Sequence, residues 1–265
     1  MKIFELIDSE VHISIGSLLY YEKEKSFIIE LQDNLTEWTA PLLFAEEVKQ
    51  NKYTVLRELS LLWVKERIIP SGRQNISSIL TNAKLSTYNE IDFLERSKGK
   101  CSQDSIFLRK LDYIPEFVLK RMQHNLKEVV FCGGADFLCF FCDGTIRKIS
   151  LYDLQETIDV EKIIANEQVL KSGHIAAGGY LVTFNDSIDV PASLLYEAGI
   201  SIPLSLNDFL CFVQNNIVDS SESCDILECS RQNLAYLVSK KTLMPVKKDV
   251  KGNLYTRGNI LGSRD

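Results

Sequence analysis

The sequence predicts an α+β protein of several small domains, each with a small mixed sheet and helices. Two observations lead to this prediction. Short runs rich in β-branched and aromatic residues, bounded by Gly, Asn and Asp, alternate along the chain with stretches of helical periodicity. The composition is that of an ordinary globular protein, because 45% of the 265 residues are hydrophobic and 25% are charged.

Strands are expected to dominate about the first 60 residues. The runs VHISIG, SLLYYE and SFIIEL are separated by Gly16 and by the charged residues 22–25, which we interpret as a hairpin tip. The pattern becomes helical over residues 45–64, and Pro70 then breaks the chain.

Two shorter helices are expected after this break. The apolar residues of segment 76–80 lie on one helical face, and a second helix has Ser86 as its N-cap and ends near Gly99. Trp38 and Trp63 are expected to be core anchors, because large aromatic side chains bury much apolar area.

The middle of the chain contains two hairpin signals. In FLCFFCDGTIRKISL, two β-rich runs meet at Asp143-Gly144, a dipeptide that tolerates positive φ. A strand over Tyr180–Phe184, a turn at Asn185-Asp186 and a short strand into Pro191 repeat this pattern. A helix is expected to begin there or one residue later and to stop at Gly199.

Three domains are predicted, over residues 1–115, 116–205 and 206–265, with the first boundary near Pro115. The third begins with SLNDFLCFVQNNIV, an amphipathic helix. No run of about 18 apolar residues occurs, and the acidic start of the chain differs from a signal peptide. We expect a cytoplasmic protein that does not bind membranes, with its seven cysteines reduced.

Charge is distributed unevenly along the chain. Residues 230–264 contain eight bases and one acid, a net charge of +7, so the rest of a chain whose formal charge is −6 carries −13. A basic segment on an acidic protein indicates a polyanionic partner, with an ordinary solvated surface as the alternative.

The basic segment predicts a winged helix-turn-helix. A helix over residues 222–227 leads to a turn at Glu228-Cys229, and Ser230 can cap a second helix. The buried stripe of this second helix is Leu234, Leu237 and Val238. A strand over TLMPVKK, a turn over DVKG ending at Gly252 and a returning strand NLYTR form the wing.

The exposed side of the second helix and the wing are the predicted DNA contacts. Arg, Gln and Ser side chains near a helix N-terminus can reach base edges or phosphates in a major groove. Lysines on a wing lie where phosphates flank a bound helix. The predicted contact residues are Ser230, Arg231, Gln232, Asn233, Tyr236, Lys240, Lys247, Lys248, Lys251 and Arg257.

The segment SRQNLAYLVSKKTLMPVKKDVKGNLYTRGNIL resembles the winged helix-turn-helix of excisionases and related regulators, over residues 217–261. The resemblance implies that Arg231, Gln232 and Tyr236 face DNA. It also implies that Lys247 and Lys248 of the wing contact the DNA backbone. The chain departs from this family at Lys241-Thr242, where such domains carry a glycine before the wing. A protein-docking module is the alternative.

Two other regions resemble known families. Part of the first domain is similar to the N-terminal region of HipA-like kinases, which belong to toxin–antitoxin or phage-defence systems. The matching residues are Trp63, Lys65, Arg67, Ile69, Pro70 and Arg73, and more loosely Gly99, Ser102 and Asp104. The phosphate loop and catalytic motifs of a kinase are missing. Residues 126–205, with Phe141–Gly144 and Ile188–Tyr196, resemble a small bacterial α+β domain family without a known biochemical function.

No constellation of residues predicts catalysis, a cofactor or a metal site. Cys139 and Cys142 have a redox or metal spacing, but residues three apart in a strand face opposite sides, which favours core or half-buried thiols. The loop CGGAD at residues 132–136 is interpreted as a plain turn, because no helix follows it. The three histidines are isolated in the sequence: His12, His124 and His174.

The sequence therefore predicts a non-enzymatic DNA-binding regulator, transcriptional or antitoxin-like, in a bacterial defence or toxin–antitoxin module. Its partners would be duplex DNA and a protein, either a second copy or a toxin-like protein. Specific binding by such a small domain favours a homodimer on two half-sites. The alternative is a protein inhibitor or adaptor that binds a kinase-like toxin or a nucleic-acid-guided effector, with the basic tail on acidic protein or RNA. An enzyme built across the first two domains is a third possibility.

Overall fold

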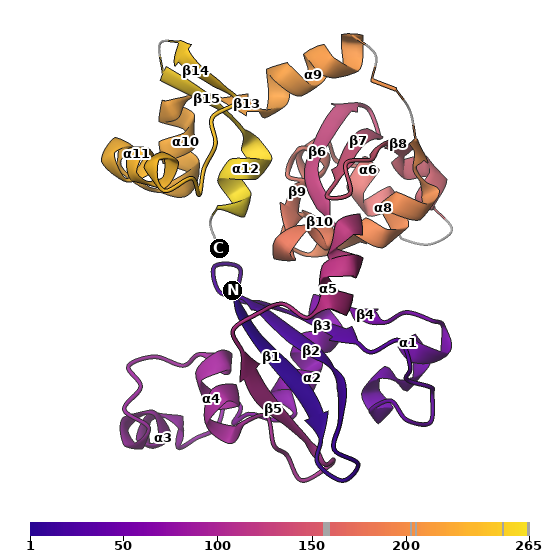
Figure 1. Ribbon diagram of the computed structural model, residues 1–265, viewed down its shortest axis with the longest axis vertical. Helices are drawn as coiled ribbons and strands as arrows, with labels where there is room; N and C mark the ends of the chain where they lie inside the picture. The colour runs from indigo at the N-terminus through magenta and orange to yellow at the C-terminus, as the bar shows by residue number, and fades with distance from the viewer. Residues whose placement is uncertain (156–159, 202, 205, 251, 264–265) are drawn as a thin grey trace. The chain divides into compact units, whose positions relative to one another are not determined.

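The protein has the predicted α+β fold, with helices interspersed among four small antiparallel sheets in the part of the chain that the structure describes (Figure 1). The computed structural model describes residues 1–155, 160–201, 203–204, 206–250 and 252–263. The chain divides into two compact units, Met1–Lys120 and Arg121–Asp265, which have separate hydrophobic cores. No helix among the described residues has both the length and the apolar character needed to cross a bilayer.

The first unit is built on a five-stranded sheet with the order β4-β3-β2-β1-β5. Its strands are β1 Lys2–Asp8, β2 Ile13–Tyr21, β3 Ser26–Leu31, β4 Thr54–Val55 and β5 Ile106–Leu111. The predicted hairpin tip at residues 22–25 joins β2 to β3. Gly16 does not separate two strands as predicted, because it lies inside β2, where a Cβ atom would come within 2.3 Å of the Glu30 carbonyl oxygen. This glycine lets β3 approach closely.

The helices that begin in the first unit are α1 Ala45–Lys49, α2 Arg57–Lys65, α3 Ile76–Asn82, α4 Glu90–Ser97 and α5 Glu116–Arg121. The helical pattern predicted over residues 45–64 forms two helices, α1 and α2, because Asn51 adopts a left-handed φ of 57° and β4 lies between them. α3 confirms the helix predicted at 76–80. The predicted cap Ser86 is wrong: Asn89 caps α4 by accepting a hydrogen bond from the Ile91 N–H at 3.4 Å.

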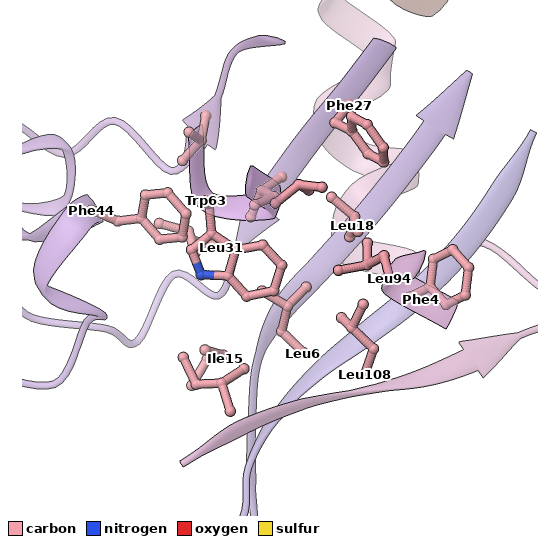
Figure 2. Packing of buried hydrophobic residues seen from close by; sticks show 14 of the residues in the cluster. Phe4, Leu6, Ile15, Leu18, Phe27, Leu31, Phe44, Trp63, Leu94 and Leu108 are labelled. Carbon is pink, nitrogen blue, oxygen red and sulfur yellow. The ribbon is translucent and has the colours of Figure 1, made fainter. Parts of the chain in front are cut away.

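Trp63 lies in the core of the first unit, as Figure 2 shows. Its ring stacks on Phe44 with 6.4 Å between the ring centroids, and both side chains are buried. Leu6 and Leu18 from the sheet belong to the same buried cluster. Trp38, predicted as a second anchor, is instead 87% exposed. It lies in a surface turn closed by backbone hydrogen bonds to the Thr36 carbonyl.

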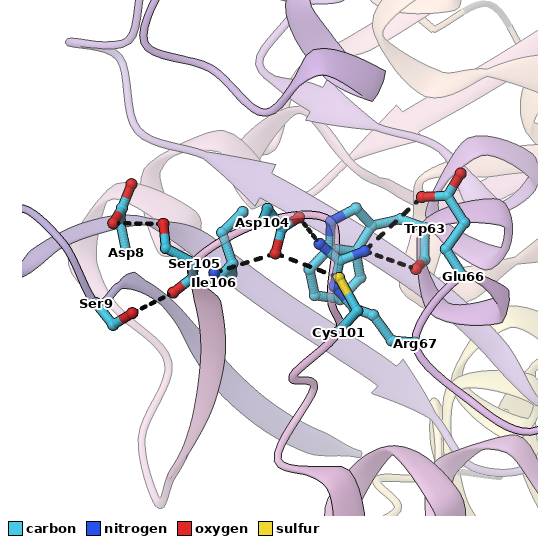
Figure 3. Close-up of polar contacts among 9 residues, drawn as sticks. All are labelled: Asp8, Ser9, Trp63, Glu66, Arg67, Cys101, Asp104, Ser105 and Ile106. Carbon is cyan, nitrogen blue, oxygen red and sulfur yellow. Dashed lines mark hydrogen bonds and ion pairs between the residues drawn. The ribbon is translucent and has the colours of Figure 1, made fainter.

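A buried arginine lies beside this core (Figure 3). The Arg67 side chain is 1% exposed, and its guanidinium carbon lies 3.7 Å from the centroid of the Trp63 ring. Arg67 Nη1 donates to the Trp63 carbonyl at 3.2 Å, and Nη2 forms an ion pair with Asp104. The Asp104 carboxylate also accepts from the Ile106 N–H at 3.1 Å. This network joins the end of α2 to the segment just before β5.

The second unit holds the other three sheets of the described residues. The first of these sheets consists of β6 Leu126–Gly133, β7 Asp136–Phe141, β8 Ile146–Ser150 and β12 Ile200–Ser201. The second sheet consists of β9 His174–Ala176, β10 Leu181–Phe184 and β11 Ile188–Pro191. The third sheet consists of β13 Ile217–Val218, β14 Lys247–Val250 and β15 Gly252–Thr256. The helices are α6 Glu161–Ile164, α7 Glu167–Lys171, α8 Ala192–Ala198, α9 Leu206–Asn216, α10 Ser220–Leu227, α11 Arg231–Ser239 and α12 Arg257–Gly262.

Both predicted hairpins of this unit are confirmed. Gly144, with a φ of 85°, turns the chain between β7 and β8, and Asn185 and Asp186 do so between β10 and β11 with φ values of 50° and 55°. α8 follows Pro191 directly and ends at Gly199, as predicted. Turns of this kind are set by a few adjacent residues, which explains why the sequence alone locates them.

Candidate nucleic-acid interface

α10 and α11 form the predicted helix-turn-helix, and local hydrogen bonds fix the ends of both helices. Asp219 caps α10 by accepting a hydrogen bond from the Glu222 N–H at 2.9 Å. α10 ends at Glu228, whose left-handed φ of 52° turns the chain. Ser230 caps α11 by accepting a hydrogen bond from the Asn233 N–H at 3.3 Å, as predicted.

One stripe of α11 packs inward, and the opposite side is exposed. Leu234 is buried in a core that includes Tyr255 and Ile260, and Leu237 and Val238 pack against it. The predicted stripe is confirmed. The exposed residues from the start of α11 to its C-cap are Arg231, Gln232, Asn233, Ala235, Tyr236, Ser239 and Lys240.

Several predicted contact residues interact with the protein itself. Arg231 Nη2 donates to Ser221 Oγ at 3.3 Å, which links α11 to α10. The Lys240 ammonium lies 5.6 Å from the centroid of the Tyr236 ring, which is itself 56% exposed. The Ser230 hydroxyl serves as the helix cap. These contacts orient the side chains of Arg231 and Lys240, and neither contact neutralises the positive charge.

The wing differs from its prediction at both ends of its first strand. β14 begins at Lys247 rather than at the start of TLMPVKK, because Pro245 has no N–H to donate to a strand ladder. Residues 249–250, predicted in the turn, belong to β14. Lys247 is exposed, whereas the Lys248 side chain and all of Lys251 lie outside the described residues.

A further exposed base, Lys241, lies between α11 and the wing, and it was not among the predicted contacts. Its φ of 60° is the left-handed conformation that glycine adopts most readily. The lysine keeps this conformation at a cost of about 1 kcal/mol, as estimated for L-residues. Lys241 therefore adds a positive charge at a position where the backbone turns.

Arg257 lies at a different place from the exposed side of α11. The predicted strand NLYTR ends at Thr256, and Arg257 begins α12, a helix that the sequence analysis missed. Thr256 caps α12 by accepting from the Asn259 N–H at 3.3 Å, and such a cap just before Ile260 and Leu261 is the signal that could have found it. Arg257 lines a cavity of about 540 Å³ whose described walls include no residue of α11.

Glu128 of β6 is a buried carboxylate in the wall of this cavity, and it too was missed. Its Oε2 accepts from the Gly258 N–H at 3.0 Å and from Asn216 Nδ2 at 3.4 Å. Burial raises the pKa of Glu128, although hydrogen bonds from Thr256 and Gly258 act in the opposite direction. One side chain thereby joins the end of α9 and the start of α12 to β6.

We expect Glu128→Gln to be at least as stable as the wild type at pH 7.5, and Glu128→Ala to be about 1–3 kcal/mol less stable. The amide still accepts from Gly258 but has no charge to desolvate. Because the raised pKa belongs to the folded state, the folded protein binds this proton more tightly than the unfolded one. The resulting stabilisation is present at low pH and is lost as the pH rises through the folded-state pKa.

Urea unfolding followed by circular dichroism at pH 5.5 and 7.5 measures this effect. Between these values the wild type should gain stability on acidification relative to Glu128→Gln. A difference between the two proteins that does not change with pH would contradict the assignment.

Within the described chain, no group of three or more His, Cys, Asp or Glu side chains could hold a metal ion. Cys139 is buried in the core, as predicted, whereas Cys142 is exposed rather than half-buried because β7 ends before it. The described histidines are dispersed: the His124 ring stacks on Tyr196 at 4.0 Å, and His174 Nδ1 lies 3.1 Å from the Ser172 carbonyl oxygen.

Comparisons with models of protein families, with curated proteins and with solved structures find no significant match. The resemblances to excisionases, to HipA-like kinases and to the small α+β family stay predictions. The candidate interface therefore depends on its own residues and on their arrangement.

Proposed function

We propose that the protein binds duplex DNA through the exposed side of α11 and the β14–β15 hairpin, and that it acts without enzymatic activity as a transcriptional or antitoxin-like regulator. One observation carries this proposal. The exposed side of α11 presents cationic and hydrogen-bonding side chains, while its aliphatic stripe is held in the core. A helix held in this way by a preceding helix is the element that a helix-turn-helix places in the major groove.

The side chains on this face suit a duplex. Arg231 and Gln232 lie in the first turn of α11, and these residue types form bidentate contacts with guanine and adenine edges. Lys240 and Lys241 follow the end of the helix, and Lys247 begins the wing, where lysines contact phosphates. The sequence of α11, RQNLAYLVS, contains no acidic residue that would repel a phosphate.

Arg231→Ala should weaken binding to a preferred duplex by about tenfold or more, because the loss of one bidentate base contact costs about 1–3 kcal/mol. Fluorescence anisotropy with DNA from the promoter of its own gene, at one fixed salt concentration, measures the change. Arg73→Ala is the matched control, because Arg73 is also exposed but belongs to the loop before α3. Equal binding by the wild type and Arg231→Ala would exclude Arg231 from reading bases.

A single domain of this size makes few DNA contacts, so the proposal includes a homodimer on two half-sites. α9 offers an apolar surface for a second copy, because Phe209, Leu210 and Val213 are exposed. The other side of the helix packs inward, with Phe212 against Phe140 at 5.2 Å between ring centroids. Apolar side chains exposed together on one helix are a feature of protein contact surfaces.

Phe209→Glu with Val213→Glu should convert the dimer to a monomer in sedimentation analysis, because four carboxylates would face one another across a two-fold contact. The circular dichroism spectrum should stay unchanged, since neither side chain is buried. Leu42→Glu, at an exposed apolar position outside α9, is the control and should leave the dimer intact. A wild type that sediments as a monomer at micromolar concentration would contradict the dimer.

The second candidate function is a protein inhibitor or adaptor of a kinase-like toxin or a nucleic-acid-guided effector. The exposed apolar residues of α9 favour it, since they suit a surface of another protein as well as a second copy. An inhibitor of this kind would bind every duplex alike and would lose no preference on Arg231→Ala, whereas the proposed regulator would prefer its own promoter, so the anisotropy assay separates the two.

A further inference from the structure

The turn between α10 and α11 brings two cysteines together. Glu228 is left-handed, its N–H donates to the Asp225 carbonyl at 3.3 Å, and the Cys229 N–H donates to the Cys224 carbonyl at 3.0 Å. These two hydrogen bonds define a Schellman motif, in which the residue after the left-handed position contacts the residue five positions earlier. That contact is usually between apolar side chains, and here both members are cysteines.

The two thiols are free and partly exposed, and both pack at the edge of the core that holds Leu234. The Cys229 thiol lies close enough to Cys224 to contribute to raising its pKa. Burial, followed by the neighbouring Cys229, raises the pKa of Cys224, so Cys224 keeps its proton at neutral pH. Because a raised pKa lowers the thiolate fraction of Cys224, we assign the first attack on an oxidant to Cys229 and the second, resolving step to Cys224.

We propose that Cys224 and Cys229 form a redox site, in which a low-molecular-weight disulfide such as glutathione disulfide converts the two thiols into an intramolecular disulfide. The proposal goes beyond DNA binding and does not depend on it. The backbone hydrogen bond from Cys229 to Cys224 holds these two residues close together, so we expect the disulfide to form without unwinding either helix.

The exchange balances in two steps. The Cys229 thiolate attacks one sulfur of glutathione disulfide, and the first glutathione leaves as a thiolate that takes up a proton. Cys224 then loses its proton and attacks the Cys229 sulfur, which releases the second glutathione in the same way. Two electrons pass from the protein to the oxidant, which becomes two molecules of glutathione.

A second pair of thiols, Cys132 of β6 and Cys211 of α9, provides an internal comparison. Burial, together with the neighbouring Cys211 thiol, raises the pKa of Cys132 to about 12. The Cys211 thiol donates to the Phe131 carbonyl at 3.7 Å. No backbone motif links these two residues, which lie on separate elements, so the pair at the helix turn should oxidise first.

The sequence permits a direct test on the full chain. Cleavage after Glu222 and Glu228 by a glutamate-specific protease places Cys224 and Cys229 on different peptides. The protein is equilibrated with mixtures of glutathione and glutathione disulfide, quenched with acid, alkylated, digested and examined by mass spectrometry. The expected result is a linked pair of peptides, Ser223–Glu228 joined to the peptide that begins at Cys229, which separates on reduction.

Variants test the assigned order. Cys224→Ser should replace the linked pair by a glutathione adduct on Cys229, whereas Cys142→Ser, which removes an exposed thiol elsewhere, should leave the linked pair unchanged. Alkylation of both Cys224 and Cys229 at every glutathione ratio, or appearance of a Cys132–Cys211 link before theirs, would overturn the proposal.

Discussion

Replacing Lys240 and Lys247 together by alanine should weaken DNA binding about 60-fold at 0.1 M salt, because both lysines are exposed and lie where phosphates would flank α11. Each lysine that neutralises a phosphate releases a counterion, so the logarithm of the binding constant falls by about 0.9 per contact for each logarithmic unit of salt. Loss of two contacts flattens this dependence by about 1.8, and the wild type and the variant should converge near 1 M salt.

Anisotropy titrations at several salt concentrations measure this slope. Lys49→Ala with Lys120→Ala is the matched control, because both lysines are exposed in the first unit and their loss changes the net charge equally. If the control flattens the slope as much as the test variant, net charge rather than a surface at α11 accounts for binding. Equal slopes for the wild type and the test variant would show that neither Lys240 nor Lys247 contacts DNA phosphates.

The parts of this interface that the sequence predicts are the parts set by neighbouring residues. Ser230 bonds a backbone N–H only three positions away, and Leu234 with Val238 follows the period of one helix. The errors have local causes of the same kind. Pro245 delays the start of the wing, and a left-handed Asn51 ends a helix whose apolar pattern continues past it.

Contacts between distant parts of the chain could not be predicted in this way. Glu128 and Gly258 are 130 positions apart, and nothing in the spacing of either residue indicates that a buried carboxylate meets the first turn of α12. Residues of β6, α9 and α12 also line the neighbouring cavity, so the cavity depends on the same packing of distant segments. Arg257 shows the consequence, because its charge suggests DNA while its position is set by packing that the sequence does not reveal.

The same limit on prediction applies to the ion pair between Arg67 and Asp104 in the first unit. Burying this pair also costs free energy. The guanidinium is almost fully buried against Trp63 and has two ion-pair partners, the closer Asp104 and the more exposed Glu66, whose Oε2 lies 3.8 Å from Arg67 Nη1. The chain next to Asp104 is held in turn by Ser105, whose hydroxyl donates to Asp8 at 2.8 Å (Figure 3). Loss of the Asp104 carboxylate should therefore leave the Arg67 guanidinium buried, because the surrounding structure keeps it from moving out to water.

Asp104→Ala should lower the free energy of unfolding of the first unit by about 3 kcal/mol, because it removes the closer carboxylate from a buried guanidinium and leaves the longer pair with Glu66 at 3.8 Å. Arg67→Met combined with Asp104→Ala should recover a large part of this loss, since a methionine of similar length needs no partner. Urea unfolding followed by tryptophan fluorescence reports on this unit directly, because both tryptophans of the chain, Trp38 and Trp63, belong to it.

Glu5→Ala is the comparison for this result, because it breaks an ion pair with Arg109, whose side chain is 63% exposed, and should cost less than about 1 kcal/mol. The contrast follows from desolvation: water can replace the partner of Arg109 but cannot reach the guanidinium of Arg67. If Asp104→Ala costs no more than Glu5→Ala, or if the double variant is less stable than Asp104→Ala alone, Arg67 contributes through its packing on Trp63 and not through its paired charge.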